Sequence, residues 1–231
     1  MTDLLPEHLF ADPIRSALDT AHSHLAIGDS LARRYPADVA PFATLGELGE
    51  AAMERLRGQL APGEGIWLYG TDFPAVSGLE VVDRMPCPQM GLQGHIAPPE
   101  PNADVVALTE ANAHEMVALT DLAFPGFFRP RTYLMGSYYG IRAPSGELIA
   151  MGGERMKLTG YAEVSAVCTH PSFRGRGLAE SIIWQMVRRH RREGVQSFLH
   201  VGRANTRAIA LYERLGFVIR REITITRVVR V

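Results

Sequence analysis

The fold of this chain is decided by residues 163–193, which read EVSAVCTHPSFRGRGLAESIIWQMVRRHRRE. The apolar run over 163–169 predicts a strand, and apolar positions at helical spacing over 178–187 predict a helix. Gly175 and Gly177, in the turn between them, allow backbone angles and a close approach that a side chain would forbid. Such a turn, placed between a strand and a helix, presents N–H groups and a positive helix end to a phosphate. The stretch therefore predicts an α/β fold that binds a phosphate-bearing ligand here.

The sequence on both sides continues this alternation of strands and helices. The 231 residues are 46% hydrophobic and 21% charged, a composition that excludes disordered, collagen-like and coiled-coil chains. Downstream, the helix runs to Glu193, Gly194 closes it, and a strand follows over Ser197–Val201. Upstream, we expect strands at Val105–Leu108, Tyr138–Arg142 and Leu148–Arg155, a turn at Ala143–Gly146, and a helix that begins after Thr109–Asn112 and continues through Leu122.

Two motifs in this order resemble the GNAT superfamily of acyl-CoA-dependent N-acetyltransferases. Arg174, Gly177 and Ala179 match the family signature of Gln or Arg, two variable residues, Gly, one variable residue, then Gly or Ala. The stretch from Asn205 to Phe217 matches the second, more C-terminal family motif. The resemblance covers residues 104–231. It implies an α/β domain with a mixed, mostly antiparallel sheet and flanking helices, acetyl-CoA as cosubstrate, and transfer of its acetyl group to a primary amine by direct attack.

The resemblance also implies roles for particular residues. In the family, the strand before the turn pairs through its backbone with the pantetheine arm of the cofactor, and the turn holds the pyrophosphate. Asn205 is expected to hydrogen-bond the cofactor near the thioester, and the flanking Arg203 and Arg207 to meet its phosphate charge. The residues expected to bind the cofactor are Val167, Cys168, Thr169, Arg174, Gly175, Arg176, Gly177, Leu178, Ala179 and Asn205.

Tyr212 occupies the position at which many family members place a catalytic acid. A departing thiolate belongs to an acid with a pKa of about 8.5, so a hydroxyl held beside the sulfur can protonate it. The alternative is that Tyr212 is a core aromatic, because Ile209 and Leu215 share its helix and one face must be buried. A buried tyrosine would still need a partner for its hydroxyl.

Glu163 is the predicted general base. An amine attacks only when neutral, and a lysine-like amine has a pKa of about 10.4, so a base or a desolvating site must remove its proton. Glu163 lies eleven residues before Arg174, the offset of the catalytic glutamate in the histone acetyltransferase branch of the family. Burial at the edge of an apolar cleft would raise its pKa toward neutrality. The alternative is an exposed glutamate at a strand end with no role.

The first 100 residues match no family pattern. Asp12 and Pro13 predict a helix start and Tyr35-Pro36 its end, and a second helix is expected over Leu45–Leu60. Short strands are expected at Ile66–Tyr69 and Leu79–Val82, and a linker at Pro86–Pro101. We therefore predict a smaller helix-and-strand domain over 1–100 and the acetyltransferase domain over 104–231. The order of elements in the first domain suggests a degenerate copy of the second.

Charge is divided unevenly between the two ranges. Residues 1–100 carry 14 acidic side chains against six arginines, and residues 101–231 carry 18 basic side chains against 11 acidic ones. This division indicates two units, the second suited to a polyanion, or two halves that attract each other. The basic run Arg188–Arg192 ends a helix, where cations offset the helix dipole, so nucleic acid is not an expected partner.

The loop Phe124–Arg131 is rich in aromatic and basic residues. It corresponds to the region that often covers the acceptor site in the family. Phe127, Phe128 and Arg131 are therefore expected either to select an apolar or anionic acceptor or to pack the first unit against the second. The acceptor itself, a small molecule or a peptide amine, is not encoded in any motif.

The remaining sequence features bound the location and the class of the protein. Cys87 and Cys168 are isolated, so we expect reduced core thiols, no disulfide and no metal site, with burial raising the pKa of Cys168. The acidic N-terminus lacks a signal-peptide pattern and no apolar run reaches membrane-spanning length, so we expect a cytoplasmic protein. The alternative to an enzyme is a non-catalytic CoA-binding module that recruits a partner through its acidic N-terminal domain.

Overall fold

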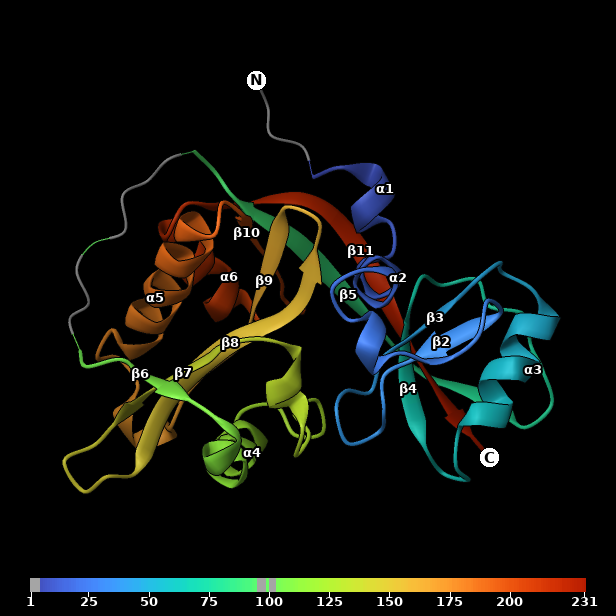
Figure 1. Cartoon of the computed structure of the whole chain (residues 1–231), viewed down its shortest axis with the longest axis horizontal. Coiled ribbons are helices and arrows are strands. Elements are labelled where there is room, and N and C mark those ends of the chain that lie inside the picture. The colour runs from blue at the N-terminus through green and yellow to red at the C-terminus, as the bar shows by residue number, and fades with distance from the viewer. Residues whose placement is uncertain (1–4, 95–98, 100–102) are drawn as a thin grey trace.

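The computed structural model describes residues 5–94, 99 and 103–231. Its main feature is an eight-stranded sheet with the order β4-β11-β5-β10-β9-β8-β7-β6 (Figure 1). Only β9 and β10 pair in parallel, and all other neighbours are antiparallel. The predicted mixed, mostly antiparallel sheet is thus confirmed. The strands are β4 (Gly65–Tyr69), β5 (Leu79–Leu92), β6 (Val106–Leu108), β7 (Tyr138–Arg142), β8 (Leu148–Leu158), β9 (Tyr161–Thr169), β10 (Gln196–His200) and β11 (Phe217–Arg230).

Helices cover both faces of this sheet. On one face lies α5 (Leu178–Arg192), with α6 (Thr206–Arg214) in the same apolar cluster, and on the other lies α4 (Ala113–Asp121). Adjacent residues of β8 face opposite sides of the sheet. Gly152 lies directly under Ile182 of α5, whereas Met151 packs in one cluster with Met116 of α4. A side chain on Gly152 would meet the methyl group of Ile182 at 2.7 Å, so this glycine sets how closely α5 approaches the sheet.

Whereas Phe10 and Ile14 pack in one cluster with Met156 and Phe198 of the large sheet, residues 27–59 form a layer beside β4, on the right of Figure 1. A three-stranded sheet in the order β1-β2-β3 packs there with α3, and Met53 and Leu56 of α3 share a buried cluster with Leu68 and Val228. The elements are α1 (Glu7–Phe10), α2 (Pro13–Asp19), β1 (Ile27–Gly28), β2 (Ala32–Arg34), β3 (Ala43–Leu45) and α3 (Glu50–Gln59), and four short 3-10 helices lie at Ser23–Leu25, Glu110–Asn112, Thr132–Met135 and Pro171–Phe173.

The predicted elements around the glycine turn are found within one to three residues of the expected bounds. The strand predictions that became β4, β6, β7, β8, β9 and β10 are confirmed, as are the helices that became α4 and α5. Local signals account for this agreement. Thr109 forms a capping box with Asn112 ahead of α4, and Gly194, with φ of 71°, follows the end of α5.

Two helix predictions in the first 60 residues were wrong in extent. The Asp12 carboxylate caps α2 by accepting from the Arg15 N–H at 2.9 Å, but α2 ends at Asp19 rather than near Tyr35. Gly28, with φ of 106°, instead directs the chain into the turn before β2. The second helix begins at Glu50, because residues 43–45 pair with β2 and Gly49 is the N-cap.

The prediction of a linker over Pro86–Pro101 was wrong for its first part. β5 continues through Pro86 and Pro88 to Leu92, between β11 and β10. A strand residue directs its N–H and C=O to the same edge, and the carbonyls of Pro88 and Pro86 accept from Val201 and Arg203, just beyond the end of β10. Proline has no N–H group, and at Pro86 and Pro88 this group would point to residues beyond the end of β10, where regular strand pairing has stopped. Of the linker's later prolines, Pro98 and Pro101 lie outside the described residues.

The large sheet includes strands from both predicted domains. β4 and β5 lie on either side of β11, whose 14 residues the sequence did not predict as a strand. The strands of the first range that enter the large sheet, β4 and β5, are not neighbours, whereas β6 to β9 form a consecutive antiparallel run. The element order of 1–100 nevertheless parallels part of 104–231, since α1–α2, β1-β2-β3, α3 and β4 follow the order of α4, β7-β8-β9, α5 and β10. The degenerate copy therefore stays a prediction. The division into two separately folding domains stays a prediction.

Candidate active site

The site begins where β9 and β10 separate. The two strands pair only through Tyr161–Glu163 and Gln196–Phe198. From Val164 onward β9 has no partner on this edge, while β10 continues along β5 at Leu199 and His200. The backbone edge of β9 from Val164 to Thr169 is therefore free of strand partners among the described residues and faces open space. A free strand edge is the arrangement that accepts an extended ligand through main-chain hydrogen bonds.

A β-bulge marks the middle of this free edge. The register between β8 and β9 jumps from the pair Met151 and Cys168 to the pair Gly153 and Ser165, so Ala166 and Val167 lie opposite the single residue Gly152. Ala166 has φ of 53°, the left-handed region that a residue with a Cβ adopts rarely. Such strain is concentrated at functional sites. The sequence Ser165-Ala166-Val167 carried no signal for it.

The glycine turn closes the adjacent end of the site. Gly175 and Gly177 have φ of 79° and 75°, so both require the freedom that the sequence indicated, and Gly177 is the N-cap of α5. A cavity of about 530 Å³ lies between this turn, the end of β9 and α6. All the residues predicted to bind the cofactor, Val167, Cys168, Thr169, Arg174, Gly175, Arg176, Gly177, Leu178, Ala179 and Asn205, line this one cavity, and so does Tyr212.

Asn205 and Tyr212 project from the two ends of α6. Asn205 is its N-cap, and the side-chain oxygen accepts from the Ala208 N–H at 3.1 Å, which leaves the amide nitrogen to donate. Tyr212 is 9% exposed, and burial raises its pKa to about 12. Its hydroxyl makes no hydrogen bond to any described residue, so it combines the packing of a core aromatic with a free donor at the cavity.

The arginines near the turn divide into lining and paired residues. Arg174, Arg176 and Arg207 line the cavity, and the Arg176 guanidinium lies 5.0 Å from the Phe173 ring centroid. Arg203 does not line it, because its guanidinium binds the Glu222 carboxylate through two nitrogens. Arg207 therefore lines the cavity while Arg203 is paired with Glu222, and the roles of both toward cofactor phosphate stay predictions.

A second cavity, of about 360 Å³, adjoins the first. The two share Phe124, Val167, Asn205, Ala208 and Tyr212 in their walls. The second cavity extends from this junction toward β4 and β5, and its wall includes residues that the sequence analysis did not select. Phe42, Tyr69, Cys87, Arg155 and His200 all contribute to it. They come from segments far apart in the sequence, which is why no local motif marked them.

Glu163 does not lie at the edge of a cleft. It is completely buried, lines neither cavity, and binds Arg155 through two hydrogen bonds of 2.9 and 2.5 Å. His200 Nδ1 lies 2.7 Å from Oε1, which Arg155 Nη2 also contacts, and the Met156 N–H donates to Oε2 at 3.2 Å. Burial alone would raise the pKa of this carboxyl, but the Arg155 and His200 interactions lower it to about 2. The predictions of a raised pKa and of an exposed strand-end glutamate were both wrong.

The aromatic loop both lines the second cavity and packs against the N-terminal residues. Phe127 and Phe128 line the second cavity. Phe127 also stacks on Trp67 of β4 at 5.5 Å between ring centroids, and Arg131 pairs with Asp38 at 3.2 Å. The loop therefore forms a wall of the cavity while it packs against the N-terminal residues.

Both cysteines are free and buried, and burial raises the pKa of Cys168 to about 12 and of Cys87 to about 11. Neither thiol is ionised near neutral pH, so neither is an activated nucleophile. No group of three or more potential metal ligands lies together in the part of the chain that the structure describes. Over the same residues, none of the helices has the length and apolar character needed to cross a bilayer.

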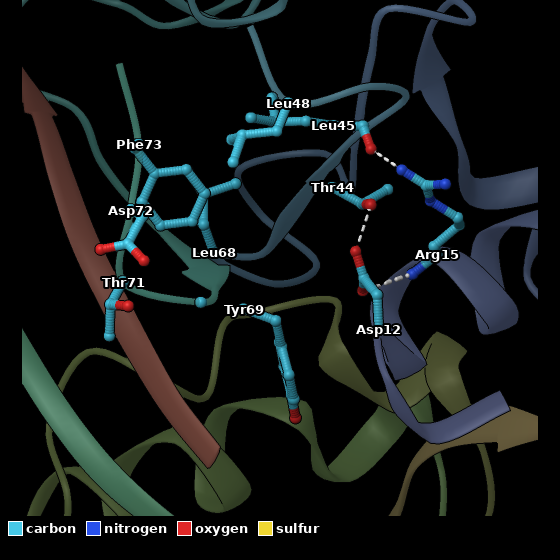
Figure 2. A pocket seen from close by; sticks show the side chains of 11 residues that line it. Asp12, Arg15, Thr44, Leu45, Leu48, Leu68, Tyr69, Thr71, Asp72 and Phe73 are labelled. Carbon is cyan, nitrogen blue, oxygen red and sulfur yellow. Dashed lines mark hydrogen bonds between the residues drawn. The ribbon is translucent and has the colours of Figure 1, made fainter. Parts of the chain in front are cut away.

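A third hollow lies between α2, β3 and β4 and shares Tyr69 with the second cavity (Figure 2). Three of its polar residues, Asp12, Arg15 and Thr44, are already paired. Asp12 accepts from the Thr44 hydroxyl and from the Arg15 N–H, and the Arg15 guanidinium donates to the Leu45 carbonyl. These contacts hold α2 against β3, so the paired residues serve the packing of these two elements.

The fold and the joined cavities match the acyl-CoA-dependent transferase class that the two motifs resemble. Comparison with known proteins shows to which family the chain is similar. A GNAT-family protein from Novosphingobium aromaticivorans, assigned as an acetyltransferase, is 33% identical, with a TM-score of 0.87 over 97% of this chain and 99% of that protein. The GCN5-related N-acetyltransferase of Kribbella flavida shares the fold at 19% identity, with a TM-score of 0.62 over 96% and 95% of the two chains.

The family model for FR47-like protein matches residues 138–226, which include β9, the glycine turn and α6. No match was found among the curated proteins. This chain belongs to the GNAT family of acetyltransferases, as the resemblance implied. The family relationship extends over the first 100 residues as well, which the sequence motifs alone did not reach.

Proposed function

We propose that this protein transfers an acetyl group from acetyl-CoA to a primary amine by direct attack. The observation that carries the proposal is the larger cavity, because every residue on the predicted list of cofactor-binding residues lines it, as does Tyr212, and it adjoins a second cavity large enough for an acceptor. The thioester supplies an activated acetyl group, so no nucleophilic side chain is required, and neither cysteine is suited to be one.

The residues of the chain have separate tasks in this proposal. The turn at 174–179 and the N-terminus of α5 bind the diphosphate through N–H groups. The free edge of β9 at Val167, Cys168 and Thr169 pairs with the pantetheine arm, and Asn205 orients the thioester end. Tyr212 protonates the departing thiolate, since its hydroxyl remains protonated well above neutral pH and has no other described partner.

Two measurements test the proposal in order. Thermal-shift titration with CoA and acetyl-CoA should raise Tm, because a ligand that binds only the folded state stabilises it. Free thiol should then accumulate from acetyl-CoA in the presence of amines. A rise in Tm without thiol release from any amine in a broad panel would instead support the non-catalytic CoA-binding module.

A further inference from the structure

The second cavity has an apolar, aromatic wall that indicates the kind of amine it accepts. Phe42, Phe127 and Phe128 lie in the wall with Tyr138. These rings are held in place from behind: Phe127 stacks on Trp67, and Phe128 meets Tyr138 edge-on at 5.4 Å between centroids. Rigid aromatic walls favour flat apolar ligands, because little side-chain entropy is lost on binding.

The charges around this cavity disfavour a second cation. No carboxylate is among the described residues that line it. Its one charged lining residue is Arg155, whose guanidinium is bound by the buried Glu163 and lies 4.9 Å from the Phe42 ring centroid. A second ammonium group in the ligand would lose its hydration and gain no opposite charge.

We propose that the acceptor is a primary amine carried by an aromatic body with no second positive charge, such as an arylalkylamine. The aromatic part occupies the space between Phe42, Phe127 and Phe128, and the amine lies between Tyr69 in the wall of the second cavity and the junction of the two cavities at Asn205 and Tyr212. Polyamines and lysine side chains in basic peptides are thereby excluded as preferred acceptors. This inference rests on the proposed function.

The test compares acceptors at saturating acetyl-CoA. 2-Phenylethylamine and tryptamine should show kcat/KM at least about tenfold above putrescine, spermidine and a lysine-containing basic peptide, the scale set by burial of an aromatic group. A preference for putrescine, spermidine or the peptide would overturn the inference. Equilibrium binding of 2-phenylethylamine to the CoA complex gives a readout without turnover. Binding without thiol release would support this inference and contradict the proposed function.

Two matched variants test whether the aromatic wall of the second cavity determines the acceptor preference. Phe127→Ala should lower kcat/KM for 2-phenylethylamine about tenfold and leave CoA affinity unchanged, because Phe127 lines only the second of the two joined cavities. Phe73→Ala removes the same group from the hollow in Figure 2 and should change neither value. Equal losses in the two variants would contradict the assignment.

A different observation, a chain of hydrogen bonds, concerns the proton of the amine. The Tyr69 hydroxyl lies 3.0 Å from His200 Nε2, and His200 Nδ1 lies 2.7 Å from the Glu163 carboxylate. Tyr69 and His200 line the second cavity, and Glu163 lies behind them. Since Glu163 is ionised, Nδ1 donates to it. The Gln89 amide nitrogen, 3.0 Å from Nε2, also donates, so Nε2 is left as the acceptor.

We infer that Tyr69, His200 and Glu163 form a proton relay for the attacking amine. As the nitrogen bonds to the acetyl carbon and the carbon–sulfur bond breaks, the amine proton passes to Tyr69 Oη and the phenol proton passes to His200 Nε2. Tyr212 gives its proton to the thiolate, and solvent restores both ends. Glu163 is a positioning residue that holds the imidazole tautomer and stabilises the imidazolium, as a carboxylate does behind a catalytic histidine.

The pH dependence of kcat distinguishes this relay from a structural role. The charged or titratable groups around His200 are Glu163, Arg155, Tyr69 and Cys87. Burial lowers the pKa of His200 below 6.5, and Glu163 opposes this. At saturating arylalkylamine, kcat should therefore rise through a limb below pH 6.5 and be flat from pH 7 to 8. In Glu163→Gln the limb should move to lower pH and the plateau should fall.

Tyr69→Phe keeps the ring and removes the hydroxyl, so kcat should fall about 100-fold while KM changes little, the scale of a general base. Tyr139→Phe is the control, since its hydroxyl faces Arg189 at 3.4 Å outside both cavities. Wild-type Tm and CoA affinity in Tyr69→Phe would show that it folds. Unchanged kcat in that folded variant, or an unmoved limb in folded Glu163→Gln, would overturn the relay.

Discussion

At the scale of single residues, Tyr212 carries the clearest chemical expectation. Tyr212→Phe should lower kcat about 100-fold and leave the affinity for CoA within twofold, because the ring still packs and only the proton donor is lost. Burial raises the pKa of Tyr212 to about 12, so wild-type kcat should show no decline from loss of this proton below about pH 10. Steady-state kinetics and calorimetry check the two parts. A loss confined to CoA affinity would refute the acid role.

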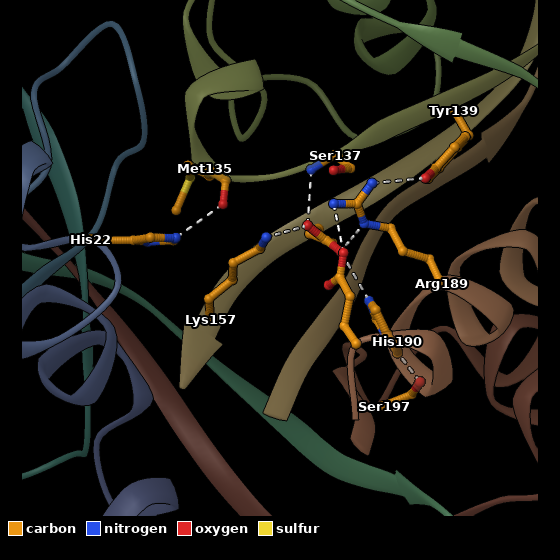
Figure 3. A network of polar contacts seen from close by, with 10 residues as sticks. His22, Met135, Ser137, Tyr139, Lys157, Arg189, His190 and Ser197 are labelled. Atoms are coloured by element: carbon orange, nitrogen blue, oxygen red, sulfur yellow. Dashed lines mark hydrogen bonds and ion pairs between the residues drawn. The ribbon is translucent and has the colours of Figure 1, made fainter. Parts of the chain in front are cut away.

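A second residue-scale expectation concerns Glu154, which is completely buried and is bound by residues that Figure 3 labels. His190 and Lys157 bind its carboxylate at 3.2 and 2.8 Å, and the Ser137 N–H donates at 2.9 Å. Burial alone would raise its pKa, but these contacts lower it to about 2. The ionised carboxylate therefore stabilises the folded chain above pH 4.5, and this contribution is lost as pH falls toward 2.

Glu154→Gln should consequently lower the free energy of unfolding at pH 7 by about 3 kcal/mol, because partners of a buried charge are left uncompensated. Its Tm should also fall less steeply than that of the wild type between pH 5 and pH 2. The exposed Glu147→Gln serves as the control and should follow the wild-type curve. Denaturant titration across this pH range measures both effects, and parallel curves for Glu154→Gln and wild type would contradict the assignment.

Sequence reasoning located Tyr212 and Asn205 but misjudged Glu163, and the difference has a physical basis. Tyr212 and Asn205 lie on one helix, so their spacing alone fixes how they are presented. The environment of Glu163 depends on Arg155 from β8 and His200 from β10, and neither pairing has a local signature. Tyr69 and Phe42 were missed for the same reason, because only the assembled sheet brings them to the cavity.

At the scale of elements, the turn before α5 should depend on its glycines for binding more than for folding. Gly175 has φ of 79° and nothing within 4 Å of an added Cβ, so Gly175→Ala strains the backbone by about 1 kcal/mol without a clash. Its altered N–H directions should weaken CoA binding about tenfold. Gly146→Ala is a matched control, with φ of 89° and equally open space in the turn between β7 and β8.

Thermal unfolding should show similar small losses of stability in both glycine variants, and calorimetry should show weaker CoA binding only in Gly175→Ala. Equal CoA affinity in the two variants would mean that the turn does not hold the diphosphate.

Elements with strong local signals were predicted well, and elements defined by partners were not. Capping residues and glycines fixed α4, α5 and the start of α2. β5 was concealed by Pro86 and Pro88, which are tolerated because their missing N–H groups lie beyond the end of β10. The early end of α2 was equally hidden, since the apolar spacing of 14–25 continues past Asp19, where the Thr20 and His22 N–H groups turn back onto the Ala17 carbonyl.

At the scale of the whole molecule, the two oppositely charged ranges of sequence are joined by one sheet and one cavity. β5 pairs with β11 along most of its length, and β4 pairs with its later part over Ile225–Val229. The second cavity takes Phe42, Tyr69 and Cys87 from the first range and Arg155 and His200 from the second. The charge division therefore does not separate a binding unit from a catalytic unit, because the acceptor cavity requires both.

This arrangement predicts that residues 104–231 expressed alone do not form a stable domain. Without β4 and β5, β11 would lose its partners on both edges, and the buried Phe217 and Val228 would lie against less of the core. We expect no cooperative unfolding transition and no rise in Tm with CoA, measured by circular dichroism and thermal shift beside the full chain. A fragment that unfolds cooperatively and binds CoA would establish the two-domain division and show that the N-terminal strands serve only the acceptor side of the site.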